Sequence, residues 1–398
     1  MVGRILRLVI RLVILSSPIR KSGCNPCPGT GGRPGAEGAA WALLAGVFAL
    51  AGCAGIADKP ATAGKDAIQV YWPMPPDQPR FKYEFRLRSP SDIEETTEEQ
   101  RLKQLLAGAP ATTEPAFQKP IALAARQGRI YVADSVGRTV IVFDVPRRKV
   151  FRFGLREPGS LAKPADIAID DQLQVYVVDA TYRRVFVYDN LGLFLRHIGG
   201  PGDLERPTGV AVDRDGGRIY VIDRASNESE RHRVVIYGRD GQKLSELGRR
   251  GEGEGEFNVP LQAAVGSDGT LYVLDAGNFR VQAFSPDGRF LRAFGKVGNQ
   301  LGNIARPRGI AIDAQDNLYV TDANFGNFQV FNREGQLLMA VGTPGIEDRP
   351  GRFGLVSGIA VDETGRVYVA DQLFNKIEVY RPVPEDEARK VMARDNPP

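Results

Sequence analysis

The chain has few of the residues that usually build metal or nucleophilic sites. Its 398 residues include two histidines, His197 and His232, and three cysteines, Cys24, Cys27 and Cys53. A zinc site needs about three protein ligands, and a Ser-His-Asp triad needs a well-placed histidine. No cysteine follows residue 53, so the remainder of the chain can form no disulfide. The sequence therefore argues against a histidine-based zinc site and against a catalytic triad.

Long apolar runs are also scarce. Residues 39–52 are apolar, but the run is shorter than the roughly 20 residues of a membrane-spanning helix and has the length of a signal-peptide core. It ends in Leu50-Ala51-Gly52-Cys53, which matches the bacterial lipobox, in which the signal is cut before Cys53 and the thiol carries diacylglycerol. The alternative is an uncleaved membrane anchor. Ala54, and not Asp, follows Cys53, so the motif implies an outer-membrane location facing the periplasm.

Positive charge in excess is confined to the leader. The whole chain has a formal charge of +4, but cleavage before Cys53 removes six basic residues and Glu37, which leaves about −1. Nucleic-acid binding normally needs a cationic face. The composition therefore predicts no nucleic-acid partner.

What the chain has in abundance is a repeat. The phrase Tyr-Val-x-Asp occurs six times, and its Asp residues are 45, 44, 52, 47 and 49 residues apart. The six are Asp134, Asp179, Asp223, Asp275, Asp322 and Asp371. Such a period is typical of a solenoid or a propeller.

Each copy reads as four short strands. A small apolar run, which follows a Pro in the first five copies, leads through a turn to the Tyr-Val-x-Asp strand, and two further strands follow. No long helical pattern separates them, so βαβ units are excluded. The sequence predicts an all-β, six-bladed β-propeller of four-stranded antiparallel blades.

The copies resemble NHL repeats over residues 119–381. The Gly-rich stretch Gly248–Asn258, followed by Val259-Pro260, is similar to that family's connection between blades, and copy six departs with Val356-Ser357-Gly358. The Pro-rich lead at residues 72–79 also resembles bacterial NHL-type lipoproteins. The resemblance implies a six-bladed ring. In the family's peptide-amidating lyase branch, several histidines hold zinc, and this chain lacks that set.

The N-terminal flank is predicted to close the ring. Copy six has no fourth strand, whereas residues 80–88 alternate apolar and charged side chains. We expect this segment to complete blade six, which removes an exposed strand edge. A short helix is predicted over residues 91–107, with Ser91 and Glu94 as its capping pair.

Four regions follow from these signals. Residues 1–52 are a leader and lipoprotein signal peptide, residues 53–79 a lipid-anchored Pro-rich tether, residues 80–381 the propeller and residues 382–398 a charged tail. The propeller is expected to be a monomer.

The repeated Asp suggests two uses. Six carboxylates could be metal ligands, but a ring places them on separate blades, so we interpret each as an acceptor for N–H groups of a turn. Residues 213–217 and Asp313–Asp316 could hold calcium, yet neither has the full calcium loop, and hairpin turns explain both. No metal site is assigned, although calcium stays open.

A small polar site is predicted at the channel mouth. Asp166, Gln262 and Arg308 follow the repeat Pro and should converge on the ring axis, where other copies have the small residues Ala122, Gly209 and Gly358. The alternative is that these polar residues simply line a hydrated channel.

The same face is predicted to meet a partner. The long loop from Arg224 to Arg233 supplies Arg224, Asn227, Arg231 and His232, and long loops on a rigid scaffold often carry recognition. Phe279, Phe325 and Phe374 are expected to be exposed near that face and would add apolar contacts, although each could instead cover a neighbouring blade.

The preferred interpretation is a non-enzymatic, lipid-anchored envelope module that binds a protein or polysaccharide and needs no cofactor. The alternative is a calcium- or zinc-dependent lyase or lactonase with its site at the channel mouth. A ubiquitin-ligase or RNA-binding role, as in some eukaryotic NHL proteins, is third, because no RING motif is present.

Overall fold

The structure is a computed structural model that describes residues 69–95, 106, 115–214 and 217–395. The chain divides into two compact units, Met1–Gly64 and Lys65–Pro398, and the described residues belong to the second. The leader, the lipobox with Cys53 and most of the segment 91–107 lie outside them. No helix among the described residues has the length and apolar character needed to cross a membrane.

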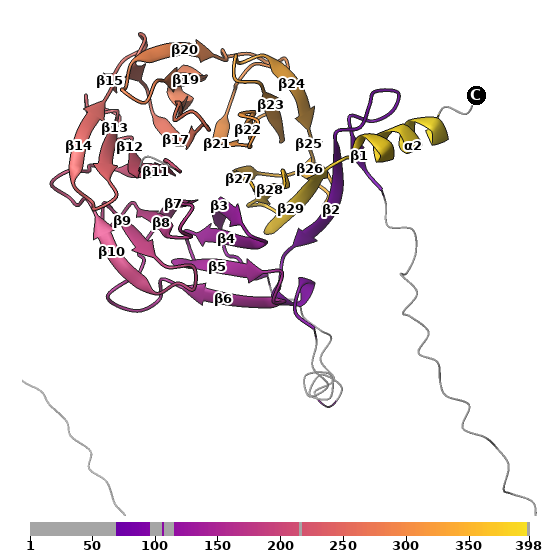
Figure 1. The fold of residues 1–398 in the computed structure, drawn as a ribbon, viewed down its shortest axis with the longest axis horizontal. Coiled ribbons are helices and arrows are strands. Elements are labelled where there is room, and N and C mark those ends of the chain that lie inside the picture. The colour runs from indigo at the N-terminus through magenta and orange to yellow at the C-terminus, as the bar shows by residue number, and fades with distance from the viewer. Residues whose placement is uncertain (1–68, 96–105, 107–114, 215–216, 396–398) are drawn as a thin grey trace, which may run out of the picture. The chain divides into compact units, whose positions relative to one another are not determined.

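Six antiparallel sheets form the blades of a β-propeller around a central channel (Figure 1). The predicted fold class is confirmed. In blades one to five, the first strand lies innermost and the strands follow in chain order towards the rim. Blades one to three consist of β3 (Pro120–Arg126), β4 (Arg129–Asp134), β5 (Thr139–Asp144) and β6 (Lys149–Phe153); β7 (Pro164–Ile169), β8 (Val175–Asp179), β9 (Arg184–Tyr188) and β10 (Phe194–Ile198); and β11 (Pro207–Val212), β12 (Arg218–Asp223), β13 (Arg233–Gly238) and β14 (Lys243–Leu247).

The other three blades repeat this order, and blade six takes its outer strands from the N-terminal flank. Blades four to six consist of β17 (Pro260–Val265), β18 (Leu271–Asp275), β19 (Arg280–Phe284) and β20 (Phe290–Phe294); β21 (Pro307–Ile312), β22 (Leu318–Asp322), β23 (Asn327–Phe331) and β24 (Leu337–Val341); and β27 (Val356–Val361), β28 (Val367–Asp371), β29 (Lys376–Pro382), β2 (Phe81–Leu87) and β1 (Tyr71–Trp72).

Two connections between blades carry short parallel ribbons. They pair β15 (Arg249–Arg250) with β16 (Glu256–Phe257), and β25 (Thr343–Pro344) with β26 (Arg352–Phe353). In the first ribbon, Gly248 at φ +86° makes room for the ring of Phe257, because a Cβ there would lie 2.2 Å from that ring. The Gly-rich stretch is thus a blade connection.

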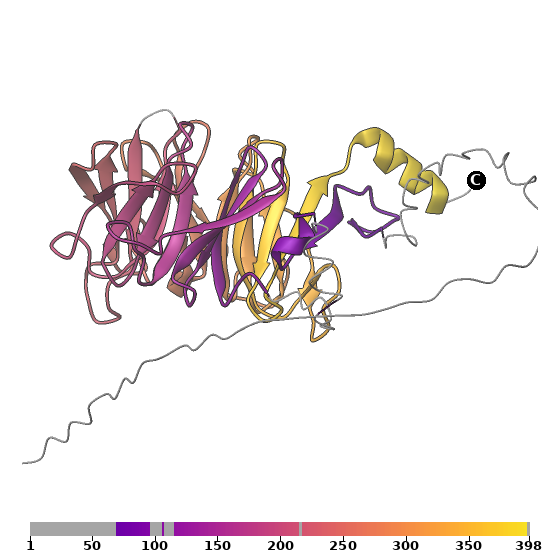
Figure 2. The ribbon, with the colours of Figure 1, turned by 90° about the horizontal axis from the view of Figure 1, so that it is seen from below.

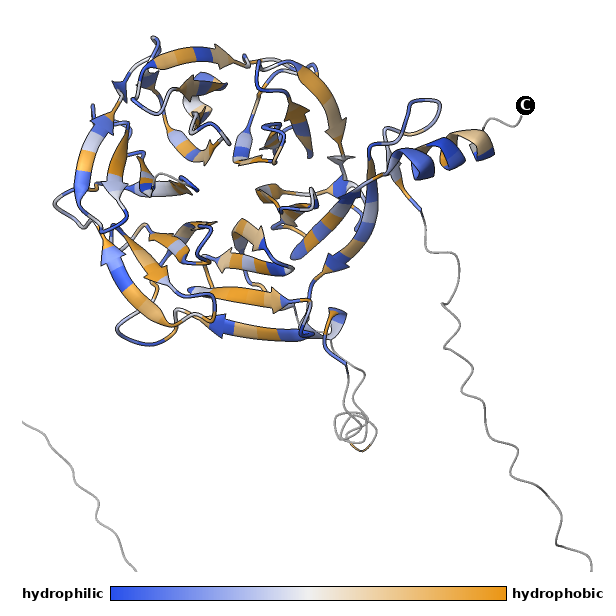
Figure 3. Ribbon diagram, viewed as in Figure 1, coloured by the Kyte–Doolittle hydropathy of each residue, from blue (hydrophilic) through white to orange (hydrophobic). Residues whose placement is uncertain are grey.

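The core is divided among the gaps between blades. The middle strands are buried on both faces, as in β4 and β5, because each blade is covered by a neighbour on either side. One cluster, for example, joins Tyr131 and Val140 of blade one to Ile167 and Val175 of blade two. Figure 3 shows hydrophobic residues on these middle strands and more hydrophilic residues on the rim strands. Seen from the side, the strands run between the two faces of the ring (Figure 2).

Ring closure occurs as predicted. β2 pairs antiparallel with β29, with Phe81 opposite Pro382 and Leu87 opposite Ile377. The closure also extends further than predicted, because Trp72 in β1 packs edge-on against Tyr380 at a ring distance of 5.3 Å. The chain that packs on the propeller therefore begins at β1, inside the segment predicted as a tether.

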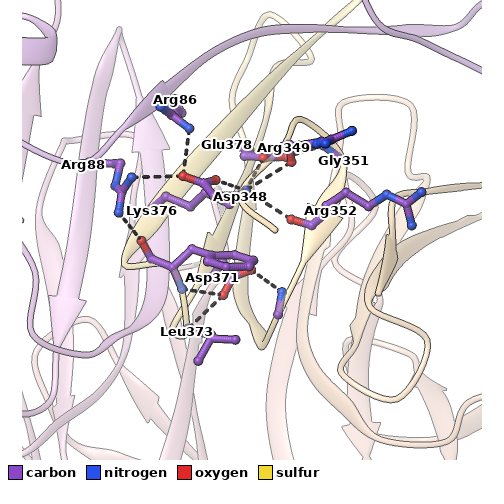
Figure 4. A network of polar contacts seen from close by, with 12 residues as sticks. Arg86, Arg88, Asp348, Arg349, Gly351, Arg352, Asp371, Leu373, Lys376 and Glu378 are labelled. Atoms are coloured by element: carbon purple, nitrogen blue, oxygen red, sulfur yellow. Dashed lines mark hydrogen bonds and ion pairs between the residues drawn. The ribbon is translucent and has the colours of Figure 1, made fainter. Parts of the chain in front are cut away.

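An ionic network that extends from the surface to the buried Lys376 and Glu378 stabilises this closure (Figure 4). Asp348, in the connection from blade five to blade six, pairs with Arg86 of β2 at 2.8 Å and with the adjoining Arg88 at 3.0 Å. It also pairs with the fully buried Lys376 at 2.9 Å, which in turn bonds Glu378 at 2.5 Å. The network links the first strand of the propeller, its last connection and its last strand.

The predicted capping pair is wrong. A 3-10 helix, η1 (Pro90–Asp92), starts directly after Ser89, because Pro favours the first helical position. The Asp92 carboxylate accepts the N–H of Ser89 at 2.8 Å, whereas the Glu94 carboxylate accepts the N–H of Val150 in blade one. A second 3-10 helix, η2, spans Ala276–Asn278, and the predicted tail contains helix α2 (Glu385–Asp395).

Candidate functional site

The repeated Asp holds one face of the ring together. Asp179 is typical: its carboxylate accepts the N–H groups of Ala162 and Lys163 from the incoming connection, at 2.7 and 2.8 Å. It also accepts the N–H groups of Thr181 and Tyr182 from the loop after its own strand, both at 2.9 Å. The prediction that these carboxylates cap turns is confirmed, since the equivalent Asp of every blade accepts N–H groups of the incoming connection.

These bonds define a surface. The connections between blades and the loops that join second to third strands lie on the same side of the ring, and we call this side the loop face. Its backbone is fixed from blade to blade by the same carboxylate contacts. The first residues of the inner strands surround the channel mouth on this side: Thr208 Oγ1 of blade three reaches Pro260 O of blade four at 3.3 Å.

Asp166 and Gln262 meet inside the channel, as their spacing suggested. Gln262 Nε2 of β17 donates to Asp166 Oδ1 of β7 at 2.7 Å, and Val210 N of β11 donates to Asp166 Oδ2 at 2.9 Å. Gln262 Oε1 accepts the N–H of Ile310 in β21 at 3.1 Å. We call this chain of bonds through blades two to five the channel belt. Gly209 permits it, because a Cβ there would lie 2.8 Å from the Cα of Gln262.

The two side chains of the channel belt are buried from solvent. Asp166 and Gln262 are 5% and 9% exposed, so both hydrogen-bond mainly to each other and to backbone. Burial raises the pKa of Asp166 to about 7, although the bonds from Val210, Ile167 and Gln262 favour its ionised form. Asp166 also borders a channel cavity of about 150 Å³, lined otherwise mostly by small and branched apolar residues. The carboxyl can therefore change charge near neutral pH.

Arg308 does not join this pair, which corrects the sequence alignment. Every inner strand has a β-bulge at its second residue. Arg308 is that second residue in blade five, whereas Asp166 and Gln262 are the third residues of their strands. Pro307 pairs with Asp322, and Gly309 pairs with Thr321. Gly309 thus occupies the place of Asp166 and Gln262, while Arg308 is the extra, half-buried residue of the bulge.

The long loop of blade three is anchored from beneath. Glu205 accepts the N–H of Ser226 and the hydroxyl of Ser229, both at 3.0 Å. His232 is fully buried: its Nε2 lies 3.0 Å from Ser226 O, and its Nδ1 accepts the N–H of Val259 at 3.2 Å. The prediction that His232 belongs to a surface for a partner is therefore wrong, because its buried imidazole links the loop to the connection that leads into blade four.

The other loop residues reach the surface. Asn227 and Arg231 are exposed, and Arg224 is half-buried with one long bond of 3.4 Å to Asn227. The three predicted aromatic residues are half-buried. Phe279 packs on the core between blades four and five, and Phe374 lies 5.1 Å from Lys376 Nζ. Phe325, in the equivalent loop of blade five, donates its N–H to Asp322.

The two calcium candidates are hairpin turns where they are described. Asp313 accepts the N–H groups of Gln315 and Asn317, and Asp316 accepts the N–H and hydroxyl of Ser267 from blade four. In the other candidate, residues 215–216 lie outside the described residues. The described part of the chain contains no group of three or more His, Cys, Asp or Glu side chains that could hold a metal.

Comparison with known proteins agrees with this geometry. The family model described as NHL repeat matches residues 204–237 and 257–284, which lie in blades three and four. The chain contains NHL repeats. Two curated relatives are similar: "Protein brain tumor" of Drosophila melanogaster, 28% identical over 33% of this chain, and "NHL repeat-containing protein 3" of Mus musculus, 30% identical over 24%. The matches span only 12% and 29% of those proteins.

Solved structures share the fold of this NHL propeller. A protein of unknown function from Bacteroides thetaiotaomicron has a TM-score of 0.55 at 16% identity, with 76% of each chain covered. A streptogramin B lyase has a TM-score of 0.51 at 13% identity, covering 76% of this chain and 98% of its own. A gluconolactonase from Xanthomonas campestris has 0.51 at 20%, covering 67% and 88%. At these identities the likeness concerns the fold alone.

One surface feature of the NHL propeller was missed from the sequence. A pocket of about 560 Å³ lies in the connection from blade five to blade six, next to the closure network. Ile346 lines it and is 94% exposed, together with Glu347, Arg349 and Phe353. The only signal in the sequence was an isolated Ile within a polar, Pro- and Gly-containing stretch.

Proposed function

We propose that this NHL propeller is a non-enzymatic module of the cell envelope that presents its loop face to a protein or polysaccharide partner. The observation that carries the proposal is the construction of that face. Its loops are held by the repeated carboxylates, and the long loop between Arg224 and Arg233 is fixed by Glu205 and His232 while Asn227 stays exposed. A rigid scaffold with an exposed loop suits recognition.

The anchoring part of the proposal depends on Cys53. The lipobox supports a lipid-anchored, monomeric protein at the outer membrane, facing the periplasm, since acyl chains on a cysteine hold a protein at a bilayer. Fractionation of cells that make the wild-type chain or the Cys53→Ser variant tests it. The wild type should remain with the outer membrane and gain acyl mass, and the variant should do neither. Equal fractionation of the two would contradict the anchor.

The binding function is tested by site-specific photo-crosslinking in intact cells. A photoreactive residue in place of exposed Asn227 should give a discrete crosslinked species. The matched control replaces exposed Asp240, in a hairpin on the opposite face, and should give none. Identical patterns from both positions would refute a partner on the loop face.

The second candidate is a calcium- or zinc-dependent lyase or lactonase. The observation that favours it is Asp166, a buried carboxyl beside the channel cavity with a pKa of about 7. The test measures the metal content of the full chain in detergent, and its melting temperature with chelator and with added calcium or zinc. Stoichiometric metal with a melting temperature that falls on chelation would favour the enzyme.

A further inference from the structure

Basic residues gather at the channel mouth on the loop face, next to the repeated carboxylates that accept backbone N–H groups there. Four basic residues directly precede the first residue of an inner strand, and two more directly follow Pro307 or Asp223. We call these six residues, which come from blades one, two, three and five, the mouth cations: Lys119, Lys163, Arg206, Arg224, Arg306 and Arg308.

Backbone contacts show that these residues share one place in the fold. Arg224 N donates to Arg206 O at 3.2 Å, so the two guanidinium groups of blade three start from neighbouring backbone. The same bond recurs between residues 135 and 119, 180 and 163, and 323 and 306. Ser357 Oγ of blade six lies 3.0 Å from Pro120 O of blade one, which keeps adjacent strand starts together at the mouth.

The mouth cations have no ion pair within the described part of the chain. By contrast, two cations at other strand ends are neutralised: Arg129 by Asp144 at 2.8 Å and Arg280 by Asp275 at 3.0 Å. The nearby Glu205 is occupied by Ser226 and Ser229. The side-chain charges of the mouth cations are therefore free of ion pairs in the described residues, while the repeated carboxylates nearby are used by backbone N–H groups.

Two of the six mouth cations are partly buried beside another arginine. Burial and the neighbouring Arg206 lower the pKa of Arg224, and burial and the neighbouring Arg306 lower the pKa of Arg308. Arg224 Nε is buried without a hydrogen-bond partner. An anion at either guanidinium would offset the repulsion, since carboxylates bind guanidinium groups through paired hydrogen bonds.

We propose that the mouth cations bind an acidic segment of a protein partner, with Arg224 and Arg308 as its main contacts. This deepens the proposed binding function and rests on it. Arg308, the bulged residue of β21, lies beside Arg306 at the mouth. Half-buried Phe279 and Phe325, with Tyr182 at 38% exposure, lie on the same face and supply apolar contacts. A peptide that mixes carboxylates with apolar side chains complements both features.

The probe is a fluorescent peptide of alternating Glu and Leu, and the reference is the same peptide with Gln in place of Glu. Fluorescence anisotropy with the full chain in detergent should show binding of the Glu peptide that weakens as salt is raised. Arg224→Gln and Arg308→Gln should each weaken it about tenfold, because a charge-assisted hydrogen bond is lost. The control Arg214→Gln, an exposed residue at the opposite mouth of the channel, should bind like the wild type.

Several results would overturn this assignment. They are equal binding of the Gln peptide, unchanged affinity of both Arg variants, or stronger binding of polygalacturonate or of a single-stranded RNA than of the Glu peptide. Thermal unfolding of each variant checks that the ring is intact. If Asn227 crosslinks to its partner equally in wild type and in Arg224→Gln/Arg308→Gln, this site is wrong while the loop-face function stands.

Discussion

Gln262 of blade four donates a 2.7 Å hydrogen bond to the carboxylate of Asp166 in blade two, across the width of blade three. Blades two and four are not neighbours in the ring. The bond therefore ties the inner strands across the channel, and it depends on the absence of a side chain at Gly209. A carboxyl held in this way should make the stability of the ring depend on pH.

The Asp166→Asn variant tests that dependence. Burial raises the pKa of Asp166 to about 7, so between about pH 4 and pH 7 the folded state keeps a proton that the unfolded state releases. Wild-type stability from this group therefore falls as pH rises through that window. Because Asn does not titrate, the melting temperature of the variant relative to wild type should rise from pH 4 to pH 8. The exposed Asp77→Asn variant should follow wild type, and parallel curves for Asp166→Asn would contradict the prediction.

Removing one of the repeated Asp residues should lower the stability of the ring, because each carboxylate accepts N–H groups of the loops. Asp179→Ala leaves four backbone N–H groups without their acceptor, and an unsatisfied buried donor costs about 1–3 kcal/mol. We expect the free energy of unfolding to fall by about 3 kcal/mol in urea. Asp171→Ala is the control, since it breaks only a partly exposed pair with Arg126 worth about 0–1 kcal/mol. Equal losses in the two variants would show that these hydrogen bonds add nothing.

How far the sequence predicts this molecule differs between its strands and its site. The Tyr-Val-x-Asp period predicts both the six blades and the hydrogen bonds at their loops, because each copy contains the Asp that accepts the loop N–H groups. The alternation of apolar and charged side chains in residues 80–88 predicts the closure strand, because a strand at the edge of a blade buries one of its two faces. Arg308 was misplaced because it comes one residue after its Pro, whereas Asp166 and Gln262 come two residues after theirs, and the bulge puts the second residue of each inner strand out of the ladder. The burial of His232 depends on Val259, in the next repeat, which no local pattern encodes.

Lys376→Met should strongly destabilise the ring. Lys376 is fully buried, and its loss leaves Glu378, 1% exposed, without its cation, which typically costs about 3–5 kcal/mol. Burial already raises the pKa of Glu378, and Lys376 opposes that rise, so the loss should grow as pH increases.

The neighbouring blades suggest how to rescue that variant. Gln282 and Gln329 occupy the place of Glu378, and each accepts the N–H of a connection glycine as Glu378 does from Gly351. Lys376→Met/Glu378→Gln should therefore recover much of the lost stability in chemical unfolding. A double variant no more stable than Lys376→Met would show that the charge on Glu378 is not the cause.

The strand β2, which closes the ring, should contribute to the stability of the folded protein through its buried apolar side chains. Leu87 is 0% exposed and packs between blades six and one, so Leu87→Ala should lower the free energy of unfolding by about 2–5 kcal/mol. Leu106→Ala, at a residue 77% exposed, is the matched control and should change little. Similar urea midpoints for the two variants would contradict a closed blade six.

The pairing of β2 with β29 also sets the order in which the protein can mature. A ribosome makes β2 before any blade, and it makes β29, the partner of β2, only after blade six has begun. The edge of β2 therefore stays unpaired during most of synthesis. During that interval the unpaired edge of β2 and the growing ring are open to pairing with other chains. The ring therefore acquires its final rim only once β29 has been made and has paired with β2.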